Sequence, residues 1–170
     1  MQGKTCHPTS RFMQKYEMLS LNLPSYPAKI IDRDGKQEIF DDVRRRYVAL
    51  TPEEWVRQHF VHFLLEHKGY PKTLLANEVR LRLNSTTKRC DTVLYATNLS
   101  ARMIVEYKAP HVAITQKVFD QVSRYNMALH VDYLVVSNGL RHYCCRMDYE
   151  HQRYVFLKDI PHYQDLSAPI

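Results

Sequence analysis

The sequence predicts a mixed α/β fold in which helices flank a β-sheet. Two segments carry apolar residues at helical spacing, and shorter alternating segments with turn residues between them have the pattern of strands. The chain has 170 residues, which suits one domain with a single core. Within that domain we distinguish an N-terminal appendage (1–50), a core (51–160) and a C-terminal tail (161–170).

The appendage has the pattern of a β-hairpin. Residues 29–32 and 36–40 flank a short turn formed by Arg33, Asp34 and Gly35. Aspartate and glycine are typical of such turns because they tolerate the backbone angles that reverse the chain. We therefore expect two antiparallel strands before residue 50.

The strongest helix signal begins at Thr51. The Thr51 side chain can cap the helix, Pro52 suits the first helical position, and Glu54 completes a T-x-x-E capping box. Apolar residues then recur at helical spacing until Gly69 and Pro71. Glycine and proline end helices, so we expect this helix to stop there.

Three strands are predicted after this helix. Residues 78–83 alternate between polar and apolar side chains, and a turn at 84–87 leads into a second run at 90–96. These two runs are expected to pair antiparallel. A third strand is predicted at 102–108, and Pro110 closes it because proline cannot donate to a ladder.

The last part of the core returns to helical spacing and then to strands. A helix is predicted over residues 115–129, where apolar side chains lie on one side. Strands are expected at 133–136, near 141–146 and near 153–157. The predicted order is therefore helix, three strands, helix and further strands.

The charge of the chain favours a polyanionic partner without proving one. Lys and Arg number 24 against 18 Asp and Glu, which gives a formal net charge of +6 and a pI near 9.1. Basic residues gather at Arg44–Arg46 and at Arg80, Arg82, Lys88 and Arg89. Each group could equally be an ordinary solvated face.

Missing motifs exclude several classes of protein. The four glycines are too far apart for G-x-G-x-x-G or a phosphate loop, which excludes common Rossmann dehydrogenases and nucleotide motors. G-x-S-x-G and H-E-x-x-H are also absent. The four cysteines lack C-x-x-C spacing and are expected to be reduced. Without a long apolar run or a leader, we expect a cytoplasmic protein with no membrane partner.

Asp91 and the run Val105-Glu106-Tyr107-Lys108 carry the clearest chemistry. Residues two apart on a strand share a face, so Glu106 and Lys108 project together while Tyr107 points away with its carbonyl available. Asp91, near the start of the preceding strand, can bring a second carboxylate beside Glu106. Such carboxylates repel unless a cation neutralises them, and Mg²⁺ suits this role because it takes hard oxygen ligands.

These residues resemble the signature of the PD-(D/E)XK nuclease superfamily. Asp91 is followed by 14 residues and then by Glu106-Tyr107-Lys108. Gln121 and Tyr125 are similar to the Q-x-x-x-Y element of one subgroup. That subgroup contains the N-terminal nuclease domain of type I restriction enzyme R subunits.

The resemblance extends over about residues 18–158 and implies a fold. Residues 51–58 and the turn at 137–139 are also similar to small standalone relatives of that domain. A restriction-endonuclease-like core is implied, with a mixed sheet and the order helix, three strands, helix, strand. Cys90 departs from the signature, which has proline at this position.

The resemblance implies a metal-dependent mechanism. Asp91 and Glu106 would hold Mg²⁺, with Mn²⁺ as a substitute, together with the carbonyl of Tyr107. The metal would polarise the scissile phosphate and acidify a bound water. Lys108 would orient or deprotonate that water.

A third carboxylate is also implied, and two residues compete for that role. Glu54 would join the metal shell from its helix, although T-x-x-E is equally an ordinary capping box. Glu78 is the second candidate, because alternation places it with Arg80 and Arg82 on the polar face of its strand.

Substrate contacts are expected from one helix and from the basic strands. Lys117, Gln121 and Tyr125 lie one helical turn apart and can line one groove, although Tyr125 fits the apolar core equally well. The basic residues expected to contact DNA are Arg80, Arg82 and Arg89.

The leading hypothesis is a Mg²⁺-dependent DNA endonuclease of the type I R-protein N-terminal kind, without an ATPase motor in this chain. It would act alone, with a separately encoded helicase or translocase, or with restriction-modification subunits. The alternative is a catalytically inactive nucleic-acid-binding module of the same fold. A structural or assembly protein is a third reading, which only the hydrophobic core supports.

Overall fold

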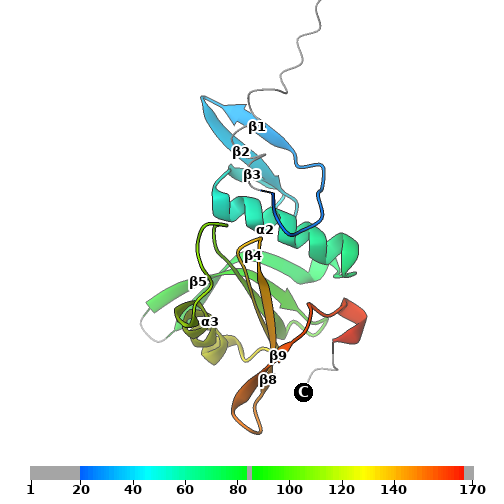
Figure 1. Cartoon of the computed structure of the whole chain (residues 1–170), viewed down its shortest axis with the longest axis vertical. Coiled ribbons are helices and arrows are strands. Elements are labelled where there is room, and N and C mark those ends of the chain that lie inside the picture. Colours follow the sequence, from blue (N-terminus) through cyan, green and yellow to red (C-terminus); the bar gives the residue numbers. More distant parts are fainter. Residues whose placement is uncertain (1–19, 84–85, 167–170) are drawn as a thin grey trace, which may run out of the picture.

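The computed structural model describes residues 20–83 and 86–166, without the side chains of Leu83, Thr86, Tyr125, Met127 and Ala128. Within these residues the chain forms a mixed α/β structure with a six-stranded sheet and a three-stranded sheet. Figure 1 shows the smaller sheet on the far side of helix α2 from the larger one. The predicted fold class is confirmed.

The smaller sheet contains the predicted hairpin and one additional strand. Its strands are β1 (Ile30–Arg33), β2 (Lys36–Asp41) and β3 (Arg46–Ala49), in that order and antiparallel. The carboxylate of Asp32 accepts a hydrogen bond from the Gly35 N–H at 2.9 Å, which fixes the turn. Sequence analysis did not predict β3, because its first residue belongs to the arginine run.

Helix α2 (Pro52–His62) begins where the sequence predicts. The Thr51 hydroxyl accepts a hydrogen bond from the Glu54 N–H at 3.0 Å. In a full capping box the Glu54 carboxylate would accept a hydrogen bond from the Thr51 N–H. Here it binds other side chains, Arg44 and Gln58. The helix continues as a π-helix (Phe63–His67), and the chain leaves it at Gly69, which has a φ of +72°.

The larger sheet has its strands in sequence order. They are β4 (Leu75–Leu83), β5 (Thr86–Tyr95), β6 (Ala101–Tyr107), β7 (Tyr133–Ser137), β8 (His142–Asp148) and β9 (Arg153–Leu157). Neighbours are antiparallel except β6 and β7, which are parallel. A parallel connection needs a crossover, and helix α3 (Gln116–Leu129) provides it. Short 3₁₀ turns lie at Lys72–Leu74 and Tyr163–Asp165.

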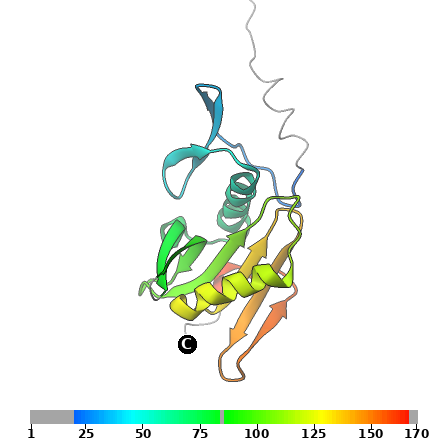
Figure 2. The same ribbon diagram turned by 90° about the vertical axis from the view of Figure 1, so that its left-hand side faces the viewer.

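Two apolar clusters hold the helices against the larger sheet. One cluster joins Val56 and Phe60 of α2 to Val105, Tyr107 and other residues of the sheet. The other packs α3 against the sheet through residues that include Val118, Phe119, Val122, Ile104 and Val136. Figure 2 shows α3 running across the sheet. The sheet is therefore the middle layer between two helices.

A buried polar chain attaches the smaller sheet to the larger one. Asp41, at the end of β2, accepts a hydrogen bond from the Asn77 amide at 2.9 Å. The Asn77 carbonyl oxygen in turn accepts one from the Thr92 hydroxyl at 2.7 Å. All three side chains are buried. Their satisfied hydrogen bonds offset the cost of burying polar groups between the sheets.

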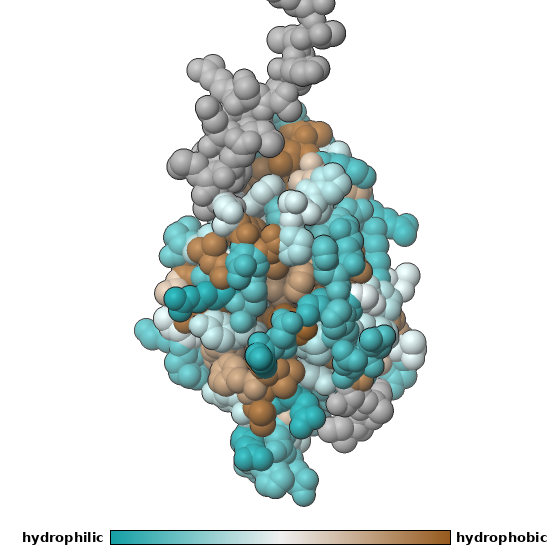
Figure 3. All heavy atoms as spheres, turned by 45° about the vertical axis from the view of Figure 1, so that its right-hand side comes forward, coloured by the Kyte–Doolittle hydropathy of each residue, from teal (hydrophilic) through white to brown (hydrophobic). Residues whose placement is uncertain are grey.

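The surface mixes hydrophilic and hydrophobic residues. Figure 3 shows teal hydrophilic side chains around smaller brown areas on one face of the molecule. None of the described helices is long and apolar enough to cross a membrane.

Gly139 provides a test of how the turn after β7 packs. Its φ is +81°, and an added Cβ would lie 2.7 Å from Leu21 Cδ2 and 3.0 Å from Val56 Cγ2. Gly139→Ala should therefore destabilise the fold by roughly 1 to 3 kcal/mol in urea unfolding. Gly35→Ala is the matched control, because Gly35 has a φ of +76° and no atom within 4 Å. Equal losses in both variants would contradict the packing argument.

Candidate active site

The candidate site lies where strands β5 and β6 separate. Their pairing runs from Tyr95 and Ala101 to Thr92 and Val105. The next residues along the two strands are Asp91 and Glu106. Instead of a ladder bond, the Tyr107 N–H donates to the Asp91 carboxylate at 2.8 Å. The carboxylate thus satisfies a buried backbone donor at the position where the sheet opens.

Glu106 and Lys108 share one side of the strand end, as the sequence predicts. The Lys108 ammonium donates to Glu106 Oε1 at 2.8 Å, and the Gln121 amide of α3 donates to the same oxygen at 2.8 Å. Tyr107 points the other way, into the core, where its ring lies 5.7 Å from that of Phe60. The end of β6 therefore presents a carboxylate and an ammonium group on one side, while Tyr107 between them anchors the strand in the core.

The two oxygens of the Glu106 carboxylate have different surroundings, because Lys108 and Gln121 both donate to Oε1. The Oε2 atom is buried and has no hydrogen-bond partner among the described residues. Burial raises the pKa of Glu106 to about 7, and the nearby charge of Asp91 acts in the same direction. The hydrogen bond from Lys108 opposes this shift only in part. A buried, partly protonated carboxylate is typical of a functional site.

Arg57 of α2 is the main partner of Asp91. Its guanidinium donates to Asp91 Oδ1 at 2.9 Å and is 3% exposed as a side chain. The same guanidinium contacts Glu78 and lies 3.5 Å from Glu54. Burial acts to lower the pKa of Arg57, but the three carboxylates outweigh it and raise the pKa. For Asp91, burial is the largest effect and leaves its pKa raised despite Arg57.

Glu54 and Glu53 have different surroundings. The Glu54 carboxylate accepts hydrogen bonds from Arg44 and Gln58, each at 2.8 Å. At Glu53, burial raises the pKa, the charge of Asp91 raises it further, and the Lys108 ammonium lowers it. The charge of Glu53 is therefore felt by Asp91 and Lys108 of the candidate site. Sequence reasoning missed Glu53, because the capping motif drew attention to its neighbour.

Glu78 occupies a distorted position in β4. Its φ is +60°, between the regular pairs Asn77 with Thr92 and Val79 with Cys90. This rotation directs its carboxylate to Arg57 and to Arg89, whose Nε lies 2.6 Å away. Glu78 therefore supports the arginine that binds Asp91.

The remaining predicted residues are spread around the site. Lys117 is exposed on α3, and the side chain of Tyr125 lies outside the described residues. The predicted DNA contacts are exposed on β4 and β5, namely Arg80, Arg82 and Arg89. Of the helical groove residues, Gln121 is the one seen to contact the carboxylate pair.

The cysteines in the described part of the chain are free thiols. Burial raises the pKa of Cys90 to about 12, with the charges of Glu106 and Asp91 adding to the shift. Cys144 and Cys145 are also buried, and burial raises their pKa values to about 12 and about 11. They pack as small apolar residues, whereas Cys6 lies outside the described residues.

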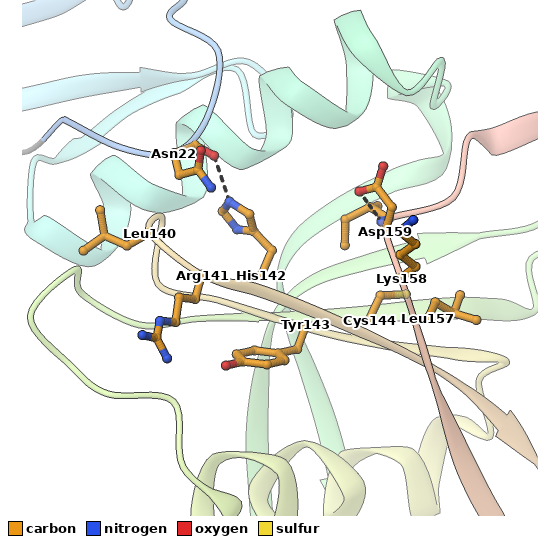
Figure 4. A pocket seen from close by; sticks show the side chains of 10 residues that line it. Asn22, Leu140, Arg141, His142, Tyr143, Cys144, Leu157, Lys158 and Asp159 are labelled. Atoms are coloured by element: carbon orange, nitrogen blue, oxygen red, sulfur yellow. Dashed lines mark hydrogen bonds between the residues drawn. The ribbon is translucent and has the colours of Figure 1, made fainter.

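A pocket of about 370 Å³ lies apart from the carboxylate pair, beside strands β8 and β9. Figure 4 shows His142 pointing from its wall to Asn22. The ring donates from Nε2 to the Asn22 carbonyl at 2.9 Å, so Nδ1 accepts from the Ser137 hydroxyl at 2.8 Å. Burial lowers the pKa of His142, which agrees with a neutral ring. His142 thus ties the segment before β1 to the sheet.

The chain is thus a mixed α/β protein with a buried pair of carboxylates where its sheet opens, between two helices. Comparison with protein families identifies the chain further. The model of the family "Type I restriction enzyme R protein N terminus (HSDR_N)" matches residues 52–161. The chain belongs to this family, which confirms that part of the resemblance seen in the sequence.

One similar solved structure is a fragment assigned as an HsdR subunit of a type I restriction enzyme from Vibrio vulnificus YJ016. It is 18% identical, with a TM-score of 0.49, and the match covers 69% of this chain and 24% of that chain. This chain therefore matches about a quarter of the length of that relative. No curated protein matches the sequence.

Removing Arg57 should strongly destabilise the protein. Arg57→Met would leave the buried carboxylate of Asp91 without its cation and would remove one of the two arginines that bind Glu78, at a cost of roughly 3 to 5 kcal/mol in urea unfolding. Arg89→Met is the matched control, because Arg89 binds the same Glu78 but is 66% exposed. That variant should lose at most about 1 kcal/mol. Similar losses in both variants would contradict a central role for Arg57.

The raised pKa of Glu106 predicts a dependence of stability on pH. Its ordinary value is 4.5 and its folded value about 7, so between them the folded state binds more protons and stability falls as pH rises. In metal-free buffer, Glu106→Gln should gain on the order of 3 kcal/mol relative to wild type between pH 5 and pH 8. Unfolding at several pH values measures this gain.

The control for this experiment is Glu150→Gln, which changes an exposed carboxyl. Its free energy of unfolding should follow that of the wild type at every pH. A constant difference between Glu106→Gln and wild type across this range would show that Glu106 ionises normally.

Proposed function

We propose that the chain is a Mg²⁺-dependent DNA nuclease of the PD-(D/E)XK type. The observation that carries this proposal is the constellation at the opening of the sheet. Asp91 and Glu106 are buried next to each other, and the Lys108 ammonium lies 2.8 Å from Glu106. Membership of the type I R-protein N-terminal family supports the same activity.

The donor set suits a hard divalent cation with few protein ligands. Among the described residues, no group of three or more His, Cys, Asp or Glu is arranged to hold a metal ion. Mg²⁺ keeps several waters and needs only one or two carboxylates beside substrate oxygens. Asp91, Glu106 and the Tyr107 carbonyl would provide these ligands. Oε2 of Glu106 has no hydrogen-bond partner among the described residues and fits this role, because a cation would give this buried oxygen a ligand bond.

Bound Mg²⁺ would supply Lewis acidity to the scissile phosphate and to the attacking water. The Lys108 ammonium is a hydrogen-bond donor that Glu106 holds in position. Burial acts to lower the pKa of Lys108, but the hydrogen bond and charge of Glu106 outweigh it and raise the pKa. Lys108 is therefore protonated at neutral pH. We assign it the orientation of the water and the stabilisation of developing negative charge, and not proton abstraction.

Two neighbours complete the proposed site. Gln121 holds the Glu106 carboxylate from α3, so the acid keeps its orientation as a substrate approaches. Glu53 extends the acidic character of the site towards α2, because its charge is coupled to Asp91 and Lys108. We assign Glu53, and not Glu54, as the helix carboxylate nearest to the reaction.

The proposed substrate is DNA, and the net charge of +6 favours such a polyanion. The 170 residues contain no phosphate loop, so we propose that any ATP-driven translocation comes from outside them, for example from a separately encoded helicase or translocase. We propose restriction-modification subunits as the partners, on the basis of the family alone.

A second candidate function is an inactive nucleic-acid-binding module. The observation that favours it is the ion pair at 2.9 Å between Arg57 and Asp91, which already neutralises one of the two carboxylates. In that case the basic strands would bind nucleic acid without cleavage.

Lys108→Ala separates these two functions. The single-turnover rate of plasmid nicking in Mn²⁺ should fall about a hundredfold or more, because a positioned charged group is lost from the reacting centre. DNA affinity measured in Ca²⁺ should fall by no more than the loss of one exposed phosphate contact would cause. Lys108→Arg should restore little activity, since the broader guanidinium cannot occupy the same position.

Lys36→Ala changes an exposed residue at the start of β2 in the smaller sheet, and as the control it should cleave like wild type. The nuclease proposal fails if Lys108→Ala cleaves as fast as wild type. It also fails if the wild type binds DNA and never cleaves it with any divalent metal.

A further inference from the structure

The β4–β5 hairpin forms a two-stranded ribbon beyond the opening of the sheet. Its strands pair as far as Leu83 and Thr86, whereas β6 pairs with β5 only as far as Thr92. The part of β5 before Asp91 therefore has β4 as its partner. Figure 1 shows this end of β5 at the left side of the molecule, beyond α3.

The two faces of the ribbon differ in character. On one face Leu81 and Cys90 are buried in the cluster beneath α3, which anchors the ribbon. The register pairs Arg80 with Arg89 and places Arg82 opposite Thr87 on the other face. The three arginines of that face are exposed.

The positive charge of the arginine face is poorly compensated. Residues 79–83 and 86–90 contain no Asp or Glu. Between described residues, Arg89 pairs with Glu78, and no ion pair involves Arg80 or Arg82. Like charges directly opposite each other destabilise a strand pair. A bound polyanion would relieve this repulsion.

We propose that this arginine face docks into the major groove of duplex DNA, an inference that rests on the proposed DNA nuclease function. The major groove, about 12 Å wide, admits a two-stranded ribbon, whereas the minor groove, about 6 Å wide, is too narrow. Arginine is the side chain that pairs best with guanine edges and with phosphates.

The position of the ribbon relative to the carboxylates supports this mode of docking. From Thr87 to Asp91 is four residues along β5, or about 13 Å at roughly 3.3 Å per residue. That length is close to the width of the major groove. A ribbon in the groove therefore carries one bordering phosphate strand past Asp91 and Glu106.

Ion pairs couple the ribbon to the site. Arg89 binds Glu78, Glu78 binds Arg57, and Arg57 binds Asp91. One chain of ion pairs, which passes through the buried Arg57, thus links the arginine face to Asp91. This continuity favours one DNA molecule that contacts both.

The test measures binding of a 20-base-pair DNA duplex in Ca²⁺ by fluorescence anisotropy. Arg80→Ala/Arg82→Ala should weaken binding at least tenfold and reduce the salt slope by about 2, at roughly 0.9 for each lost phosphate contact. The control Arg153→Ala/Lys158→Ala removes two exposed charges at the opposite edge of the sheet. It should change both quantities much less.

Groove-specific probes complete the test. Methylation of guanine N7, in the major groove, should interfere with binding, and the minor-groove ligand netropsin should not displace the protein. A double-stranded RNA of the same sequence should bind more weakly, because its major groove is deep and narrow. Netropsin displacement, or equal affinity of the two double variants, would overturn the ribbon proposal.

Failure of this proposal and failure of the nuclease function give different results. If wild type and Arg80→Ala/Arg82→Ala bind and cleave duplex DNA equally well, the ribbon proposal fails and the nuclease stands. If the double variant loses binding while wild type never cleaves with any metal, the ribbon proposal stands and the nuclease function fails.

Discussion

The buried guanidinium of Arg57 is the interaction on which the rest of the structure depends. One cation on α2 holds the carboxylates of Asp91 on β5 and Glu78 on β4, and approaches that of Glu54 on its own helix. Without it, the region between α2 and the sheet would contain buried like charges. With it, the helix is fixed at the place where the sheet opens, and the orientation of Asp91 is determined.

Where the sheet opens, the ends of the β5–β6 pairing carry the carboxylates of the candidate site, Asp91 and Glu106. Asp91 accepts the Tyr107 N–H that would otherwise lack a partner, so the sheet can end its β5–β6 pairing without an orphan donor. Glu106 follows the last paired residue and keeps one oxygen unpartnered within the described structure. Lys108 and Gln121 hold the other oxygen, and the Lys108 ammonium is the counter-ion of the carboxylate. A buried carboxyl whose pKa burial raises is typical of functional sites.

Much of the fold and the central residues of the site could be predicted, because they depend on local rules. Alternation over residues 78–83 predicted most of β4, turn residues bounded the runs that form most of β5 and β6, and the threonine cap predicted α2. The predicted turn at 84–87 extends into β5, which begins at Thr86. The two-residue period of a strand also placed Glu106 with Lys108. Contacts between distant segments could not be predicted. Neither the pairing of Arg57 with Asp91, 34 residues away, nor the binding of the Glu54 carboxylate by Arg44 follows from the local pattern. Strand β3 was missed for a local reason, since its first residue belongs to the arginine run.

The central claim is that Asp91 and Glu106 form a divalent cation site. Its most direct test is a crystal soaked in Mn²⁺ and measured at a wavelength where manganese scatters anomalously. The account predicts an anomalous peak in contact with oxygens of both carboxylates and with the Tyr107 carbonyl. A well-ordered site without such a peak, with the Arg57 guanidinium still bound to Asp91 and Glu106 still paired only with Lys108 and Gln121, would contradict it.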